Sequence, residues 1–134
     1  MRTTRIIAVL GALALALATL TIITTGGSAS AQAKPRHIGA AHGKEIRNTN
    51  KFVAFGHWET YKGRTITIQR KNCVTCGWKS YKKVETRKSD GHFRTRIAPG
   101  QKAPSRVCYR VNVPPTKNYK RTIDRVGCIK TRRV

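Results

Sequence analysis

Apolar and polar residues alternate along the chain from residue 51 onward, as in β-strands that bury one face. The clearest segment is 106–113, where Val, Tyr, Val and Val occupy every second position. Segment 64–70 repeats the pattern with Ile66 and Ile68. The same reasoning predicts strands over 51–59, 64–70, 78–87, 92–98, 106–113 and 123–134. No segment after residue 31 has a helical period, so the pattern predicts an all-β fold, an antiparallel β-sandwich of six to seven short strands.

Local signals predict how these strands are joined. Ser89-Asp90-Gly91 predicts a hairpin turn, because Asp-Gly supplies the positive φ that such turns need. Tyr81 and Val84 are three residues apart, which breaks strict alternation and predicts a β-bulge in the strand over 78–87. The stretch 71–77 is a tight loop that carries two cysteines.

The first 31 residues have the three regions of a secretory signal peptide. Arg2 and Arg5 precede an apolar run over 6–20, and a stretch of small polar residues follows. Small residues in an A-x-A arrangement predict cleavage before Gln32 or, alternatively, before Lys34. An uncleaved membrane anchor is the competing interpretation, because the apolar run can extend to about 18 residues. We expect cleavage, a secreted protein and no transmembrane segment afterwards.

Residues 32–50 contain few apolar residues and show no period. We predict a flexible N-terminal arm over 32–50, followed by one β-sandwich domain over 51–134. About a hundred residues suffice for one domain with a modest core.

The charge of the chain is strongly positive. It has 28 Lys and Arg residues against 5 acidic ones, a net charge of +23. Removal of residues 1–31 would leave 26 basic and 5 acidic residues, or +21, whereas an ordinary soluble domain carries about 2 to 8 net charges. Outside the cell such a charge attracts wall polymers, acidic polysaccharides, anionic lipid surfaces and, without sequence specificity, nucleic acid. The candidate anion-binding residues are Lys79, Lys82, Lys83, Arg94, Arg96, Arg110, Lys130, Arg132 and Arg133.

The four cysteines form an even set, and export would place them in an oxidising environment, where disulfides are expected. If the strands over 106–113 and 123–134 pair as a hairpin, Cys108 lies opposite Cys128 and Val113 opposite Ile123. Among the three possible connectivities we therefore favour Cys73–Cys76 with Cys108–Cys128.

Catalytic and metal-binding patterns are missing from the sequence. It has no nucleophile motif, and its five carboxylates are too few to indicate an acid–base pair. A structural zinc site usually needs two paired ligand motifs, whereas this chain has one Cys-x-x-Cys and two separate cysteines. We expect neither an enzyme nor a cofactor nor a bound metal. Trp78 is expected in the core, and the role of Trp58 stays open.

Four segments resemble the immunoglobulin-like repeats of bacterial secreted proteins. Gly63–Arg70 is similar to their "tVtLQR" strand, and Gly77–Tyr81 to their "gW" strand start. Thr86–Phe93 is similar to their "T-x-x-x-G-x-F" hairpin, and Tyr109–Pro114 to their "yRv.vp" strand. The resemblance spans residues 51–134 and implies an immunoglobulin-like sandwich, but its elements are structural and imply little about function. The four cysteines and the basic charge depart from the repeat pattern.

These observations predict a monomeric, non-enzymatic, secreted module that adheres to an anionic polymer or lipid surface of the cell envelope. A cationic antimicrobial or toxin-like effector is one alternative. A small inhibitor or ligand carrier is another, since carriers of the neocarzinostatin type resemble this chain in size, sandwich fold and two disulfides. Those carriers are usually acidic, which counts against that alternative.

Overall fold

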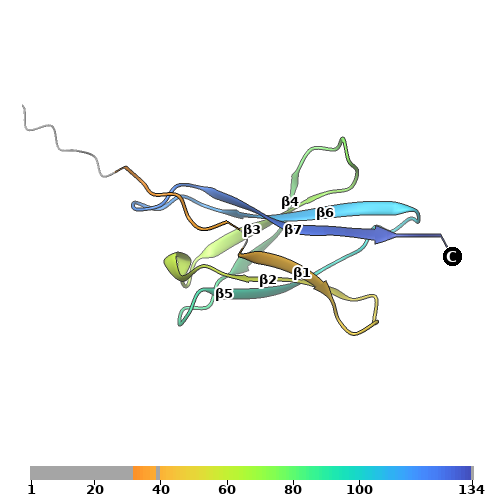
Figure 1. The fold of residues 1–134 in the computed structure, drawn as a ribbon, viewed down its shortest axis with the longest axis horizontal. Coiled ribbons are helices and arrows are strands. Elements are labelled where there is room, and N and C mark those ends of the chain that lie inside the picture. The colour runs from red at the N-terminus through yellow and green to blue at the C-terminus, as the bar shows by residue number, and fades with distance from the viewer. Residues whose placement is uncertain (1–31, 39, 134) are drawn as a thin grey trace, which may run out of the picture.

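Seven strands form two antiparallel sheets in the computed structural model, which describes residues 32–38 and 40–133. The smaller sheet has the order β1-β2-β5, from strands Ala41–Glu45, Phe52–His57 and His92–Ile97. The larger sheet has the order β4-β3-β6-β7, from strands Lys79–Glu85, Thr65–Lys71, Ser105–Val113 and Thr122–Thr131. A single 3-10 turn, η1, over Glu59–Tyr61 completes the elements of these residues. The two sheets form two layers (Figure 1), so the predicted all-β sandwich is confirmed. The predicted signal peptide lies outside the described residues.

The core lies between the two sheets, where the alternation predicted it. Ile66 and Ile68 of β3 and Val111 of β6 are fully buried. Trp58, whose role the sequence left open, is 3% exposed, and its ring stacks on Phe93 of β5 at 5.5 Å between centroids. The period-two pattern therefore identified the inward face of each of these strands correctly.

The prediction of a flexible arm over 32–50 is wrong for much of that segment. Strand β1 lies within it and pairs with β2 along its whole length, with Ala41 opposite Gly56. The backbone N–H of Ala41 donates to the carboxylate of Asp124 at 2.9 Å. Further upstream, Lys34 forms a parallel bridge with Tyr119. The segment is polar because β1 is an edge strand, which buries little more than one side chain and is held through its backbone.

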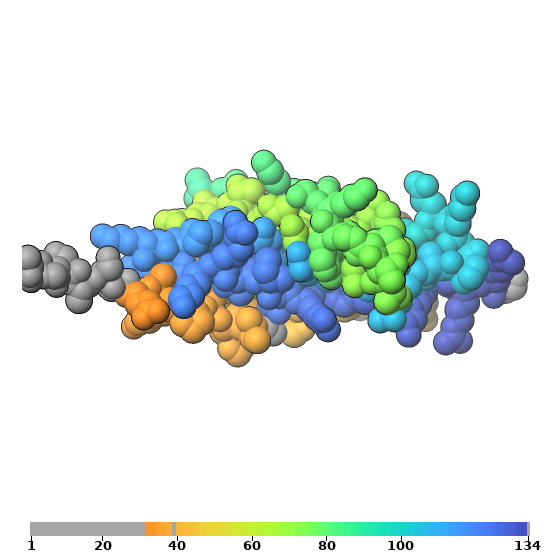
Figure 2. Space-filling model, turned by 90° about the horizontal axis from the view of Figure 1, so that it is seen from above, coloured from red at the N-terminus to blue at the C-terminus, as the bar shows by residue number. Residues whose placement is uncertain are grey.

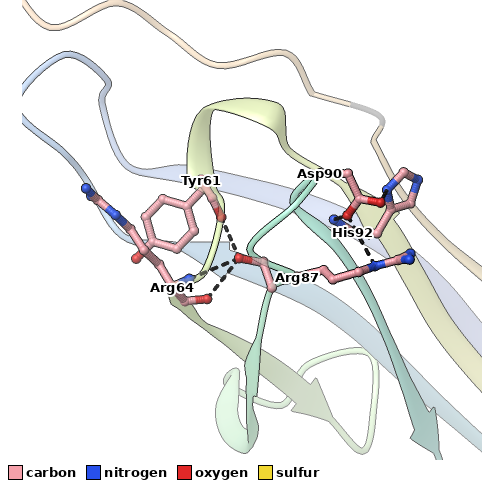
Figure 3. Close-up of polar contacts among 6 residues, drawn as sticks. Tyr61, Arg64, Arg87, Asp90 and His92 are labelled. Carbon is pink, nitrogen blue, oxygen red and sulfur yellow. Dashed lines mark hydrogen bonds and ion pairs between the residues drawn. The ribbon is translucent and has the colours of Figure 1, made fainter.

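The turn at Asp90-Gly91 exists, but it does not connect a hairpin. Strands β4 and β5, on either side of it, belong to different sheets, so the chain crosses from one layer to the other here. Asp90 accepts a hydrogen bond from the His92 N–H at 3.0 Å and forms an ion pair with Arg87 at 3.2 Å (Figure 3). Gly91 has a φ of +78°, and a Cβ there would lie 2.2 Å from the carbonyl oxygen of Trp58. The local turn chemistry was predicted correctly and its topological role was not.

The buried hydroxyl of Thr86 stabilises the same corner (Figure 3). It donates to the carbonyl of Tyr61 and accepts the N–H of Arg64 at 3.1 Å. These bonds satisfy the buried hydroxyl and join the end of β4 to the chain that leads from η1 into β3.

Two bulges adjust the larger sheet. The predicted bulge in β4 is confirmed: Ile68 lies opposite Lys82 and Gln69 opposite Ser80, which leaves Tyr81 as the extra residue. A second bulge lies in β7, where Tyr109 faces Gly127 and Arg110 faces Arg125. It shifts the register by one residue, so Val113 lies opposite Thr122 and not opposite Ile123 as predicted.

Candidate functional site

Both predicted disulfides are confirmed. Cys73 and Cys76 close the loop between β3 and β4, and Cys108 of β6 is bonded to Cys128 directly opposite it in β7. No described cysteine is free, so none of the four can serve as a thiolate ligand or a nucleophile.

The outward face of the larger sheet collects basic side chains from all four strands. The pairing places outward-facing residues in rows across the sheet, and most of these rows contain a cation. The basic residues of this surface, which we call the outer basic face, are Lys71, Lys83, Arg106, Arg110, Arg125 and Lys130. Among the described strands, the pairing places one carboxylate on this side, that of Glu85 at the end of β4. The result is a broad surface with one sign of charge, which concentrates anions near it.

Trp78 lies on the outer basic face and not in the core. Its ring is half-buried. The guanidinium of Arg110 lies 4.4 Å from the ring centroid, and the Lys71 ammonium lies at 5.2 Å. The sequence suggested a packing residue because a large aromatic ring usually prefers burial, but here the ring is half-buried and two cations lie against it.

Arg110 is held in place by a second contact. Its Nε donates to Oε1 of Gln69 on the neighbouring strand at 2.7 Å. Partial burial lowers the pKa of Arg110 below its usual value, and the group stays a cation at neutral pH. The remaining guanidinium N–H groups form a planar donor fork, the geometry that suits phosphate and carboxylate groups.

A shallow depression of about 140 Å³ lies beside Trp78. Lys71, Arg106 and Arg125 line it together with the Cys108–Cys128 disulfide. An anionic group in this depression would therefore meet cations from three strands of one sheet.

The outward face of the smaller sheet is a second basic surface. Arg94 of β5 lies opposite Phe55 of β2, and Arg96 lies opposite Val53. Lys44 of β1 lies opposite Val53, with its ammonium 5.2 Å from the Phe55 ring centroid. A half-buried aromatic ring flanked by cations thus occurs on both outer faces of the sandwich.

The structure distributes the predicted anion-binding residues over several surfaces. Lys83, Arg110 and Lys130 lie on the outer basic face, whereas Arg94 and Arg96 lie on the opposite side of the molecule. The others lie at the free edge of β4 or after the end of β7: Lys79, Lys82, Arg132 and Arg133.

Sequence reasoning missed three members of the outer basic face. Arg106 and Lys71 could have been found, because each is an even number of residues from an outward-facing position in its own strand. Arg125 could not, because the bulge in β7 reverses the alternation between Cys128 and Arg125.

The histidines do not form a metal-binding cluster. His57 and His92 lie opposite each other and stack at 4.3 Å between centroids, and His92 also contacts Asp90 at 3.1 Å. Within residues 32–38 and 40–133, no group of three or more His, Cys, Asp or Glu side chains has an arrangement that could hold a metal ion.

The hollow beside β1 and β7 is too small for an organic ligand of ordinary size. It has a volume of about 180 Å³, and Phe52, Ile97 and Val126 contribute to its lining. Pockets for small organic ligands usually measure about 300–1,000 Å³, so this space does not favour the carrier alternative.

Comparison with known proteins gives no identification. No protein family matches the chain, and neither the curated proteins nor the solved structures contain a match. In the described part of the chain, no helix has the length and apolar composition required to cross a membrane.

Proposed function

We propose that this protein is a secreted, non-enzymatic module that adheres to an anionic polymer of the cell envelope through its outer basic face. The observation that carries the proposal is the position of Trp78, half-buried on a charged sheet surface with Arg110 and Lys71 over its ring. A half-buried aromatic ring beside a guanidinium and an ammonium group suits a polymer that alternates sugar rings with phosphate or carboxylate groups.

The balance of charge supports the same function. With 5 acidic residues against 28 basic ones, most cations of the chain have no carboxylate available to them. Several carboxylates are also engaged in the fold: Asp124 accepts the Ala41 N–H, Asp90 stabilises its turn, and Glu45 accepts the Asn50 N–H. Most of the positive charge is therefore free to attract a polyanion. The disulfides are consistent with an oxidising compartment outside the cytoplasm.

Two features support an immunoglobulin-like form of the sandwich, and one departs from the constant-type arrangement. The strand orders β1-β2-β5 and β4-β3-β6-β7 place three pairs of consecutive strands in different sheets, β2 and β3, β4 and β5, and β5 and β6, so the chain passes between the layers as in Greek-key sandwiches. Tyr109 of β6 hydrogen-bonds through its hydroxyl to the backbone of Ala98, just after β5, which resembles the tyrosine corner of such folds. The fourth strand pairs with the third, whereas immunoglobulin constant-type domains place it at the edge of the other sheet.

The test is retention of the purified protein on isolated cell-envelope polymer at increasing salt concentration. We expect binding at low salt and release at high salt, because the contacts are ionic. The variant with Lys71→Ser, Arg106→Ser and Arg125→Ser removes three cations around Trp78. It should lower the slope of log affinity against log salt by about one for each cation, or about three in total.

A matched control separates the face from the net charge. The triple variant of Lys51, Lys62 and Lys117 to Ser removes the same charge from exposed positions outside the outer basic face. It should bind within about twofold of the unaltered protein. Equal weakening of both variants would show that overall charge alone drives binding, and no retention at low salt would overturn the function. Dye leakage from intact bacteria at the same protein concentration would favour the effector alternative instead.

A further inference from the structure

Two adjoining hollows lie at one end of the sandwich. They measure about 420 and 390 Å³, and Arg70 and Asn72 line both of them. The first lies against the Cys73–Cys76 loop and β4, and the second against the loop between β5 and β6. In Figure 2 these two loops, coloured green and cyan, lie beside each other at one end of the elongated molecule. We call the combined space the Arg70 cleft.

The cleft exists because Arg70 occupies an inward-facing position at the end of β3. Ile66, Ile68 and Arg70 alternate along the same face of this strand, but the first two are fully buried and Arg70 is half-buried. Strand β5 ends at Ile97, so no strand of the smaller sheet covers the continuation of this face. The chain continues as the loop over 98–104, which forms a wall of the cleft.

Arg70 is supported from behind by two tyrosines. Its guanidinium lies 4.9 Å from the Tyr81 ring centroid, and Tyr81 packs edge-on against Tyr109 at 5.5 Å. The Tyr109 hydroxyl is in turn held by the backbone of Ala98. Burial raises the pKa of Tyr109, with a hydrogen bond to Arg70 acting in the opposite direction. A stacked guanidinium of this kind is pre-organised and loses little freedom when it binds an anion.

The chemistry of the lining defines the ligand. Lys79 stands in the first hollow and Lys102 in the second, and neither lining contains a carboxylate. Ser80, Gln101 and Asn72 provide hydroxyl and amide groups that can bond to the hydroxyls of a sugar. Each hollow falls within the size range of small-ligand pockets.

We propose that the Arg70 cleft binds one or two sugar units that carry a carboxylate or phosphate group, with the acid group on Arg70 where the two hollows meet. The proposal rests on the proposed function and deepens it: the outer basic face holds the polymer through charge, and the cleft selects its sugar. Because the Tyr81 ring holds Arg70 in place, binding of the acid group to it should persist at salt concentrations that screen the diffuse attraction of the surface.

The experiment is a titration followed by backbone amide NMR in about 0.5 M NaCl, where the screening length is roughly 4 Å. The probes are glucuronate and glucose 6-phosphate, with glucose as the neutral control. We expect saturable shifts with at least one acidic sugar, centred on Asn72, Ser80 and Gln101. Arg70→Gln should weaken this binding at least tenfold, because it removes a charge-assisted bidentate contact. The matched control Arg121→Gln, in an exposed loop, should leave it unchanged.

Other outcomes overturn the proposal. Equal binding of glucose would remove the role of the anion, and shifts confined to the outer basic face would place the ligand elsewhere. If Arg70→Gln unfolds the protein, the double variant of Lys79 and Lys102 to Ser provides a second test, because it removes one cation from the lining of each hollow. Undiminished binding of the acidic sugars by this variant would count against the cleft. If neither acidic sugar binds, the proposed ligand of the cleft is refuted. Retention on the polymer at low salt would then still support the proposed function. Binding of a sugar without retention on the polymer would support the cleft and refute the adhesion.

Discussion

Truncation of Arg36 tests whether the N-terminal segment is part of the folded domain. Its side chain is 6% exposed and lies between two rings, 5.1 Å from the centroid of Tyr61 and 5.4 Å from that of Tyr119. Its Nη1 donates to the carbonyl of Lys120 at 2.7 Å. These contacts attach the chain before β1 to the segment before β7, in a region that the sequence predicts to be a flexible arm. The perturbation is Arg36→Ala.

The magnitude follows from the contacts that the truncation removes. A hydrogen bond from a charged donor contributes about 1.5–3 kcal/mol, and each ring contact about 0.5–1 kcal/mol. Opposing them, the buried Nε has no hydrogen-bond partner, and burial of the guanidinium is unfavourable enough to lower the pKa of Arg36. The net loss in the free energy of unfolding should be about 2–3 kcal/mol, or roughly 10 °C in melting temperature for a domain of this size.

Urea unfolding of the purified, disulfide-bonded protein measures this loss directly. Arg36→Met, which retains bulk without charge, should lose about 1 kcal/mol less than Arg36→Ala, because it fills the space between the two rings. Arg132→Ala, in the exposed segment after β7, is the matched control and should change stability by less than about 0.5 kcal/mol. A loss of less than about 0.5 kcal/mol for Arg36→Ala would show that the segment is not attached through this side chain.

Two further predictions concern the disulfides and the turn between the sheets. Replacing Cys108 and Cys128 together by Ser should lower the free energy of unfolding by about 3 kcal/mol, since this bond closes a loop of about 20 residues. Replacing Cys73 and Cys76 by Ser should lower it by less, because their loop is much shorter. Equal losses for the two variants in urea unfolding would contradict this expectation. The pKa of Asp90 is lowered by the hydrogen bond from the His92 N–H and by the charge of Arg87. Its carboxylate therefore stabilises the fold at pH values above its ordinary pKa of 3.8, and this stabilisation is lost as the pH falls through the lowered pKa. The stability advantage of the unaltered protein over Asp90→Asn should therefore be present at pH 7 and shrink below pH 3.8, and a difference that stays constant down to pH 2 would argue against a role for the charge.

The alternation of apolar and polar residues was sufficient to find most strands and their buried faces. Six segments were predicted as strands, and β2 to β7 lie in them to within a few residues. The Cys108–Cys128 bond was also predictable, because both residues occupy outward positions of strands that are neighbours in sequence. These properties depend on local geometry, since the side chains of any strand alternate whatever the strand pairs with.

Part of the candidate site was visible in the same way. Arg110 was among the candidate anion-binding residues, and it lies on the outer basic face beside Trp78. Trp78 itself was placed in the core, because sequence shows that a large ring prefers burial but not which surface covers it. Arg70 was not identified as a candidate, although an arginine that continues the face of Ile66 and Ile68 breaks the apolar pattern of that face.

Tertiary structure decided how the strands pair. The Asp90-Gly91 turn has the local chemistry of a hairpin, yet β4 pairs with β3 and β5 with β2, because each strand buries its apolar face against the opposite layer. Strand β1 has almost no pattern and exists through its backbone bonds to β2. At Gly127, one extra residue turns Arg125 outward and Val126 inward. The sequence by itself determined strands β2 to β7, most of their inward faces and the charge of the chain. Tertiary structure decided which strands are neighbours and where that charge gathers, because both depend on contacts between residues far apart in the chain.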